Sequence, residues 1–263
     1  ENGSEETAEV YRLSEVAPED DYFAANLQLL QALAPMPHID AVEEISKRKD
    51  TPMTELDLKH LNRRLESVKY WLENYASDEE KMQLHDTLPD SVSELDIIQR
   101  AFLNRLGHAL VDADWEAEAL QVKIFDVTRT TPIKQPLAFQ AMYTALFDRR
   151  AGPRAGNLFV FLERDYLVKH FQAISYNKVE FWQAANLSKG EFEAWLQEHQ
   201  ENIESASVEK DYADDIGALE LCIAVKDGKI HARRMLFEMD EATFNKEADV
   251  CLQQWVDKFN LKM

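Results

Sequence analysis

Three arginines that follow an apolar segment are the residues best suited to ligand chemistry in this sequence. The apolar residues 138–147 lead into Arg149 and Arg150, then a Gly152-Pro153 break and Arg154. A guanidinium group binds phosphate through two parallel hydrogen bonds and also stacks on flat rings. The pattern therefore indicates a surface for phosphate or nucleobase contacts.

The charge of the chain is unevenly distributed. A net charge of −20 argues against nucleic-acid binding by the chain as a whole. Residues 121–170, however, hold eight Lys or Arg and four Asp or Glu, whereas the remainder holds 21 basic and 45 acidic residues. Such a basic island attracts phosphates to one part of the chain and leaves them repelled elsewhere. The alternative is that the island is a solvated face without a ligand.

The sequence contains no pattern that is typical of a catalytic site. Its seven histidines lack metal-ligand spacing, and no glycine-rich loop is present to hold a nucleotide phosphate. Cys222 and Cys251 lack Cys-x-x-Cys spacing, so we expect reduced thiols. We predict no catalytic residue, no metal site and no cofactor in this chain. No stretch is long and apolar enough to predict a membrane span.

Apolar periodicity predicts helices through most of the chain. The expected helices cover residues 20–33, 41–47, 54–72, 95–110, 115–127, 134–147, 156–162, 165–174, 178–186, 189–203 and 241–261. Ser91 is expected to open a capping box for the helix that follows it, and Asp114 to cap the helix from Trp115. Trp182 and Trp195 are expected in a core.

The pattern changes near the C-terminus. Residues 205–215 are expected to form a polar, acidic linker. Alternating apolar residues then flank Asp227-Gly228, at 219–225 and 230–239, which predicts a β-hairpin. An isolated hairpin is marginal in water, so it must pack on the last helix, the rest of the chain or another domain. The predicted fold class is mainly α: a helical cage or bundle followed by a small α+β appendage with a β-hairpin.

The arginine-containing segment also carries a family resemblance. Phe139, Met142, Tyr143, Leu146 and Phe147 precede Arg149, Arg150 and Gly152-Pro153-Arg154-Ala155-Gly156. This order resembles the C-terminal, anticodon-binding half of class I lysyl-tRNA synthetases, in which Phe-x-x-Ile-Tyr-x-x-Leu-Leu leads through a basic turn to Gly-Pro-Arg-Ala-Gly. Met142 for Ile and Phe147 for Leu are mild changes in a helix core.

Further segments resemble the same family in the same order. They are residues 20–23 (Asp-Asp-Tyr-Phe), 65–89 and 115–127. The resemblance covers about residues 11–174. It departs from the family at Asn157-Leu158-Phe159, where Pro or a small residue is usual, and residues 176–263 have no known counterpart. The expected domains are therefore a frayed N-terminus at 1–10, an α-helical anticodon-binding region at 11–175 and an α+β appendage at 176–263.

The resemblance implies a tRNA-binding region that supports aminoacylation of tRNA with lysine in the cytoplasm. The class I motifs His-x-Gly-His and Lys-Met-Ser-Lys-Ser are absent from the chain. The chain alone is therefore predicted to be non-catalytic, and ATP and Mg²⁺ are expected only for the intact aminoacyl-tRNA ligase. Because the chain begins at Glu1 without a Met, we expect a fragment whose N-terminal catalytic domain is missing.

Six residues are the predicted tRNA contacts: Trp115, Arg129, Lys134, Arg149, Arg150 and Arg154. Trp115 is the candidate platform for an unpaired base, because RNA loops are read by stacking on aromatic rings. The alternative for the arginines is that they neutralise a helix end and pair with Asp148, Glu163 or Asp165, and Arg154 favours such a structural role. For Tyr143 and Phe147, core packing is favoured over stacking.

The sequence leaves two alternatives to this function open. The first is that the chain is a non-catalytic synthetase paralogue. The second is that the acidic appendage is a protein-interaction module, which would dock a partner through the edge of its hairpin. Because the appendage is acidic, its net charge predicts that it weakens RNA binding.

Overall fold

The computed structural model describes residues 22–34, 40–76 and 84–263, and the chain divides into two compact units, residues 1–83 and 84–263. The first unit contains α2 (Leu27–Leu33), α3 (Ala41–Ser46) and α4 (Glu55–Asn74). The predicted helix at 20–33 was too long, since Tyr22 and Phe23 precede α2 without helical structure. Residues 20 and 21, like the predicted frayed end at 1–10, lie outside the described residues.

A buried carboxylate organises the described part of the first unit. Asp57 forms a capping box with Thr54 at the start of α4. Its carboxylate also accepts hydrogen bonds from the Phe23 main-chain N–H at 2.6 Å and from Lys49 Nζ at 2.5 Å. These donors, Lys49 foremost, hold the pKa of Asp57 far below its usual range. The bond to Phe23 ties the non-helical residues before α2 to the start of α4.

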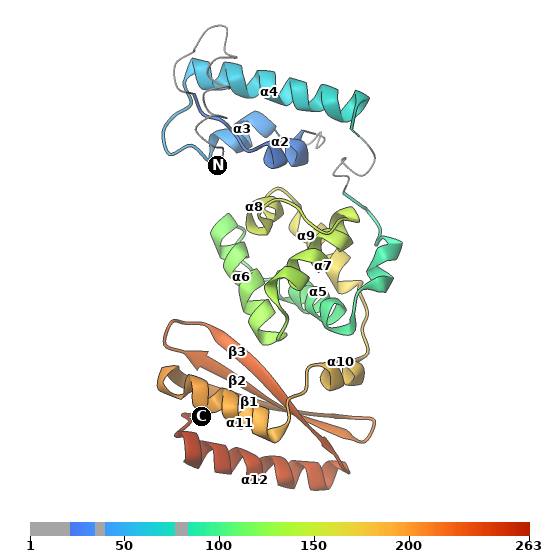
Figure 1. The fold of residues 1–263 in the computed structure, drawn as a ribbon, viewed down its shortest axis with the longest axis vertical. Coiled ribbons are helices and arrows are strands. Elements are labelled where there is room, and N and C mark those ends of the chain that lie inside the picture. The colour runs from blue at the N-terminus through green and yellow to red at the C-terminus, as the bar shows by residue number, and fades with distance from the viewer. Residues whose placement is uncertain (1–21, 35–39, 77–83) are drawn as a thin grey trace, which may run out of the picture. The chain divides into compact units, whose positions relative to one another are not determined.

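The second unit begins with helices. These are the 3₁₀-helix η1 (Asp90–Glu94), α5 (Ile97–Ala109), α6 (Ala117–Thr130), α7 (Gln135–Phe147), α8 (Ala155–Phe159) and α9 (Arg164–Gln172). Figure 1 shows α5 to α9 gathered into one bundle. Its fully buried residues include Phe102, Leu106, Met142, Phe159 and Phe171. Among the described residues, no β-strand begins before Ile203, so the predicted helical region is confirmed.

Two predicted helix caps were wrong. Ser91 and Glu94 lie in η1, and α5 is instead opened by Asp96, which forms a capping box with Gln99. Asp114 does not cap the next helix, because α6 starts only after Glu116. Asp96, five residues after Ser91, forms the capping box of α5, whereas Glu116 precedes α6 without a side-chain cap hydrogen bond. Sequence patterns place helix ends only to within a few residues.

The appendage contains a three-stranded sheet. Its elements are α10 (Lys178–Ala184), α11 (Lys189–His199), η2 (Gln200–Asn202), β1 (Ile203–Ala213), β2 (Ile216–Val225), β3 (Ile230–Glu238) and α12 (Glu241–Phe259). The strands are antiparallel in the order β1-β2-β3. The hairpin predicted around Asp227-Gly228 is confirmed, and Gly228 takes the left-handed φ of +80° that the turn needs.

The predicted linker at 205–215 was wrong, because most of it forms β1. Asp214 and Asp215 turn the chain into β2 with φ values of +51° and +60°. β1 is an outer strand whose residues are mostly exposed or half-buried. On the face of β1 that packs on the core with Ala206 and Val208, Lys210 pairs with Asp249 and so interrupts the apolar alternation by which a strand is recognised.

Each face of the sheet is covered by helices. Apolar residues of β2 (Leu219, Leu221, Ile223 and Val225) form one core with residues of α11 and α12 such as Phe192 and Trp255. On the other face, Ala218 packs with Trp182 of α10 and Ala101 of α5. The hairpin thus packs both on the last helix and on the rest of the chain. Trp182 is buried in a core, as predicted, whereas Trp195 is half-buried at a core margin.

Candidate nucleic-acid interface

Residues 148–156, the arginine turn, are held in place by Tyr143 of α7. Asp148 ends α7 in the left-handed conformation with φ of +54°. The Tyr143 hydroxyl donates to the Pro153 carbonyl, and burial raises the pKa of Tyr143 to about 12. A Cβ on Gly152 would lie 2.6 Å from the Tyr143 ring. Tyr143 is therefore a core residue, as predicted, and Gly152 is required because the ring lies so close.

Gly156 is also required for close packing. A Cβ at this position would lie 2.2 Å from the carbonyl oxygen of Ala117. The Gly156 N–H donates to Gln121 Oε1 at 3.0 Å. α8 is thereby pressed against α6, which fixes where the arginine turn ends.

The three arginines of the turn differ in their surroundings. Arg150 is exposed. Arg149 is half-buried, and its Nη2 has no hydrogen-bond partner among the described residues. Arg154 binds both carboxylate oxygens of Glu118 at 2.8 and 2.7 Å, with its side chain 49% exposed. Arg154 is thus paired with a carboxylate, although not one that the sequence suggested.

Trp115 already contacts a cation. It is half-buried just before α6, and the Arg164 guanidinium lies 4.9 Å from the centre of its ring. Arg164 also donates to the carbonyls of Val111 and Ala113 at 3.1 and 2.8 Å. These bonds fix the guanidinium over the indole, so a base can stack only on the remaining face of Trp115.

Arg129 and Lys134 line a cavity of about 380 Å³, here called the basic cavity. Arg129 lies in the last turn of α6, and Lys134 is the exposed residue before α7. The cavity is lined by Thr128, Arg129, Pro132, Ile133, Lys134, Gln135, His231 and Arg233. None of these lining residues is acidic. The helical part of the unit and the appendage therefore both contribute basic side chains to one hollow.

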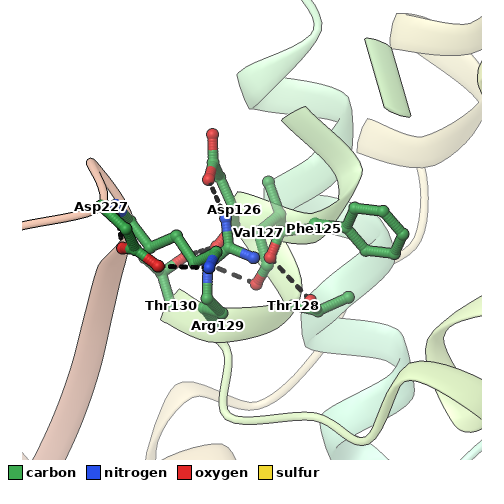
Figure 2. A network of polar contacts seen from close by, with 8 residues as sticks. Phe125, Asp126, Val127, Thr128, Arg129, Thr130 and Asp227 are labelled. Carbon is green, nitrogen blue, oxygen red and sulfur yellow. Dashed lines mark hydrogen bonds and ion pairs between the residues drawn. The ribbon is translucent and has the colours of Figure 1, made fainter. Parts of the chain in front are cut away.

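Figure 2 shows the surroundings of Arg129. The guanidinium pairs with Asp126 one turn earlier in α6, and its Nε has no hydrogen-bond partner among the described residues. The turn that carries Asp227, between β2 and β3, lies next to it. The carbonyl of Arg129 accepts a hydrogen bond from Arg233 Nη1 at 3.5 Å. This contact joins α6 directly to β3.

The sequence prediction missed His231 and Arg233. Both lie on β3, two residues apart, and so share one side of the strand. Burial, followed by the nearby charge of Arg233, lowers the pKa of His231, which keeps the imidazole neutral near pH 7. A signal was available in the sequence, because Arg233-Arg234 interrupts an otherwise apolar strand.

A second cavity of about 250 Å³, here called the paired cavity, has a different charge pattern. Its charged lining residues are Arg105, Lys178, Glu209, Asp211, Glu220 and Arg234. Arg234 and Glu220 are opposite each other on β3 and β2 and form an ion pair with side chains only 4% and 9% exposed. Lys178 pairs with Asp211. Burial lowers the pKa of Arg234 to about 10, so the guanidinium remains charged at neutral pH.

The described residues show neither a membrane-spanning helix nor a cluster of metal ligands. Within the ranges 22–34, 40–76 and 84–263, no helix is long and apolar enough to cross a membrane. The same residues contain no group of three His, Cys, Asp or Glu side chains placed to hold a metal ion. Cys222 and Cys251 are free thiols.

These features define a mainly α-helical protein with an α+β appendage and basic surfaces at helix ends. No family model matches the sequence. The chain is 26% identical to a lysine–tRNA ligase of Picrophilus torridus over 170 residues, which is 63% of this chain and 32% of that protein. It is 31% identical to a lysine–tRNA ligase of Archaeoglobus fulgidus over 114 residues, 43% of this chain and 22% of that protein.

A lysine–tRNA ligase of Methanosphaera stadtmanae is 27% identical over 121 residues, 46% of this chain and 22% of that protein. The matched segments span about a third or less of the length of these curated relatives. The similarities support a relation between this chain and lysyl-tRNA synthetases.

Proposed function

We propose that this chain is the tRNA-binding part of a lysyl-tRNA synthetase, and that it contacts the anticodon arm. The observation that carries the proposal is the similarity to several lysine–tRNA ligases, which falls on a chain with one basic segment. Unpaired anticodon bases and the surrounding phosphates are recognised by exposed cations and aromatic rings. Arg150, Lys134 and the half-buried Trp115 have the exposure that such contacts need.

The proposal assigns chemistry to another part of the enzyme. The sequence holds neither of the class I motifs that contact ATP, so ATP and Mg²⁺ would act in the intact synthetase. This chain would supply affinity and anticodon choice. Arg154 would act indirectly, because its pair with Glu118 ties the arginine turn to α6.

Two measurements on the purified chain test the proposal. Fluorescence anisotropy with labelled tRNA should show binding that weakens steeply as salt rises, because binding releases counterions from the phosphates. A lysine-dependent ATP–pyrophosphate exchange assay should show no activity. Absence of tRNA binding at low salt, or measurable exchange, would contradict the proposal.

The rival role, protein docking through the hairpin edge, is less well supported. β1 pairs along one edge of the β2–β3 hairpin. Along the other edge, Leu187 N–H donates to the Arg234 carbonyl at 2.9 Å, and Leu236 N–H donates to Asn186 Oδ1 at 3.1 Å. Strand addition needs unpaired main-chain groups, and these contacts reduce the number that the hairpin offers.

A further inference from the structure

We infer that the appendage takes part in RNA binding, and that Arg233 and His231 complete a site for an RNA backbone phosphate in the basic cavity. The inference rests on the proposed function and extends it to the appendage, the part of the chain for which the sequence suggested no ligand. Arg129 and Lys134 supply one side of the site, and β3 supplies the other.

The basic cavity suits an anion because of what lines it. Arg129, Lys134 and Arg233 carry positive charge, and no Asp or Glu is among the lining residues. The nearest carboxylates already have cationic partners: Asp126 pairs with Arg129, and Asp227 pairs with Lys229. Asp126 offsets the charge of Arg129, so Lys134 and Arg233 supply the positive charge that an anion in the hollow would offset.

Arg233 is held rigidly at the cavity. Its Nη1 donates to the carbonyls of Ala232 at 2.7 Å and Arg129 at 3.5 Å. A guanidinium has five N–H donors in total, so Nε and Nη2 provide further donors for a ligand. The guanidinium also lies 4.8 Å from the centre of the Trp195 ring. A donor fork fixed in this way loses little side-chain entropy when it binds phosphate.

An aromatic stack on the appendage supports the two basic residues of β3. Trp195 of α11 packs on the core beneath it and stacks on His199 with ring centres 4.4 Å apart. The His199 and His231 rings are 5.8 Å apart. Trp195 thus already contacts both His199 and Arg233, which favours a positioning role for this residue over stacking on a base.

Local charge and total charge predict opposite effects of the appendage. Residues 176–263 contain ten basic and 18 acidic residues, so net charge alone predicts repulsion of RNA. Charges farther from a site than the Debye length of ~10 Å at 0.1 M salt are largely screened at that site. Arg233 of β3 lies at the cavity itself, so we expect its contact with a phosphate to outweigh the effect of more distant charges.

The test compares four variants of the whole chain. They are Arg233→Gln, Lys134→Ala, the double variant, and Lys246→Ala as a control that removes one exposed charge of α12 away from the cavity. A labelled anticodon stem-loop is titrated by anisotropy over a series of salt concentrations. Arg233→Gln and Lys134→Ala should each weaken binding roughly tenfold and lower the magnitude of the salt slope by about one.

The double variant identifies a shared site. If Arg233 and Lys134 hold the same phosphate, the fold-loss of stem-loop affinity in the double variant should be smaller than the product of the two single-variant losses. Lys246→Ala should leave both the affinity and the slope close to wild type. Arg233→Lys, which keeps the charge, should retain the slope, and urea unfolding of every variant separates lost binding from lost folding.

Three results would overturn the inference. If the wild-type chain binds no stem-loop, the proposed function and this inference both fail. If wild type binds but folded Arg233→Gln behaves like Lys246→Ala, the proposed function stands and the phosphate site fails. If inorganic phosphate binds wild type at millimolar concentration and Arg233→Gln abolishes that binding while stem-loop affinity is unchanged, the cavity takes a free anion rather than the RNA backbone.

Discussion

The paired cavity and the basic cavity both lie where the appendage packs against the helices, but the charged residues that line them differ. In the paired cavity three cations lie among three carboxylates, and the pair between Arg234 and Glu220 is almost fully buried. In the basic cavity Arg129, Lys134 and Arg233 line a hollow without a carboxylate. In the first arrangement opposite charges pair with each other and join two parts of the chain. The second leaves positive charge for an outside partner.

The largest expected effect comes from breaking the buried pair. Glu220→Leu leaves the Arg234 guanidinium buried without its carboxylate, and should destabilise the protein by about 3–5 kcal/mol. Urea unfolding measures the loss. The double variant Glu220→Leu with Arg234→Met should recover most of it, because an apolar pair of similar volume needs no charge partner. A single variant as stable as wild type would show that the paired cavity is not a structural joint.

The arginine turn tests whether RNA also contacts cations outside the basic cavity. Arg149→Ala with Arg150→Ala should weaken tRNA binding and lower the magnitude of the salt slope by about one to two, while the melting temperature stays near wild type. Arg150 is exposed, whereas Arg149 is half-buried and its Nη2 atom is buried. Unchanged affinity and slope would restrict the RNA contacts to other residues.

A carboxylate placed in the basic cavity should make it resemble the paired one. Gln135→Glu changes an exposed lining residue at the start of α7 without altering its shape. An acidic residue in the first turn of a helix is favourable by about 0.3–1 kcal/mol, so the fold should not suffer. RNA binding should fall about fivefold at low salt as the new charge opposes phosphate. Equal binding by the variant and wild type would contradict the role of the cavity.

The smallest expected effect is a pH dependence set by His231. The groups that act on it are Arg233, His199 and Arg129, which lower its pKa, and Asp227, which raises it; burial is the largest cause. Because its pKa is lowered, the free protein keeps His231 neutral near pH 7, and a bound phosphate favours its protonation. RNA affinity should therefore rise about twofold as pH falls from 7.5 to 6, and less so in His231→Gln.

The stability of the free protein should decrease as pH falls, which is opposite to the trend expected for RNA affinity. When the pKa of a histidine is lower in the folded state than its unfolded value of about 6.5, the unfolded state binds the proton more readily. The free energy of unfolding is then unaffected well above pH 6.5 and decreases as the pH falls below that value. His170, whose pKa burial also lowers, acts in the same direction. Urea unfolding at several pH values checks the trend. A free protein that becomes more stable on acidification would contradict these pKa shifts.

The sequence predicted the elements whose signals are local. Asp227-Gly228 located the hairpin, and apolar periodicity located the helices of the bundle. β1 was missed because Lys210 interrupts the apolar face of this outer strand, so the strand lacks a clear period of two. Tyr143 was placed correctly in the core, but its contact with Gly152 depends on packing that periodicity does not describe.

The candidate site was only partly predictable, for a physical reason. Arg149, Arg150 and Arg154 are neighbours in the sequence and were easily recognised as a cluster. The basic cavity joins Arg129 and Lys134 to residues about a hundred positions later, so its cluster exists only after folding. Arg233 and Arg234 gave a signal, because two arginines within an apolar strand need partners on both sides. Strand alternation sends one to each cavity.

The most direct test of a tRNA-reading role is anticodon discrimination by the isolated chain. A stem-loop with a lysine anticodon and one with the same stem and a scrambled loop are titrated in parallel at low salt. Because unpaired bases are read individually, the lysine loop should bind roughly tenfold more tightly, and the preference should persist as salt weakens both. Equal affinity for the two loops at every salt concentration would contradict anticodon reading by this chain.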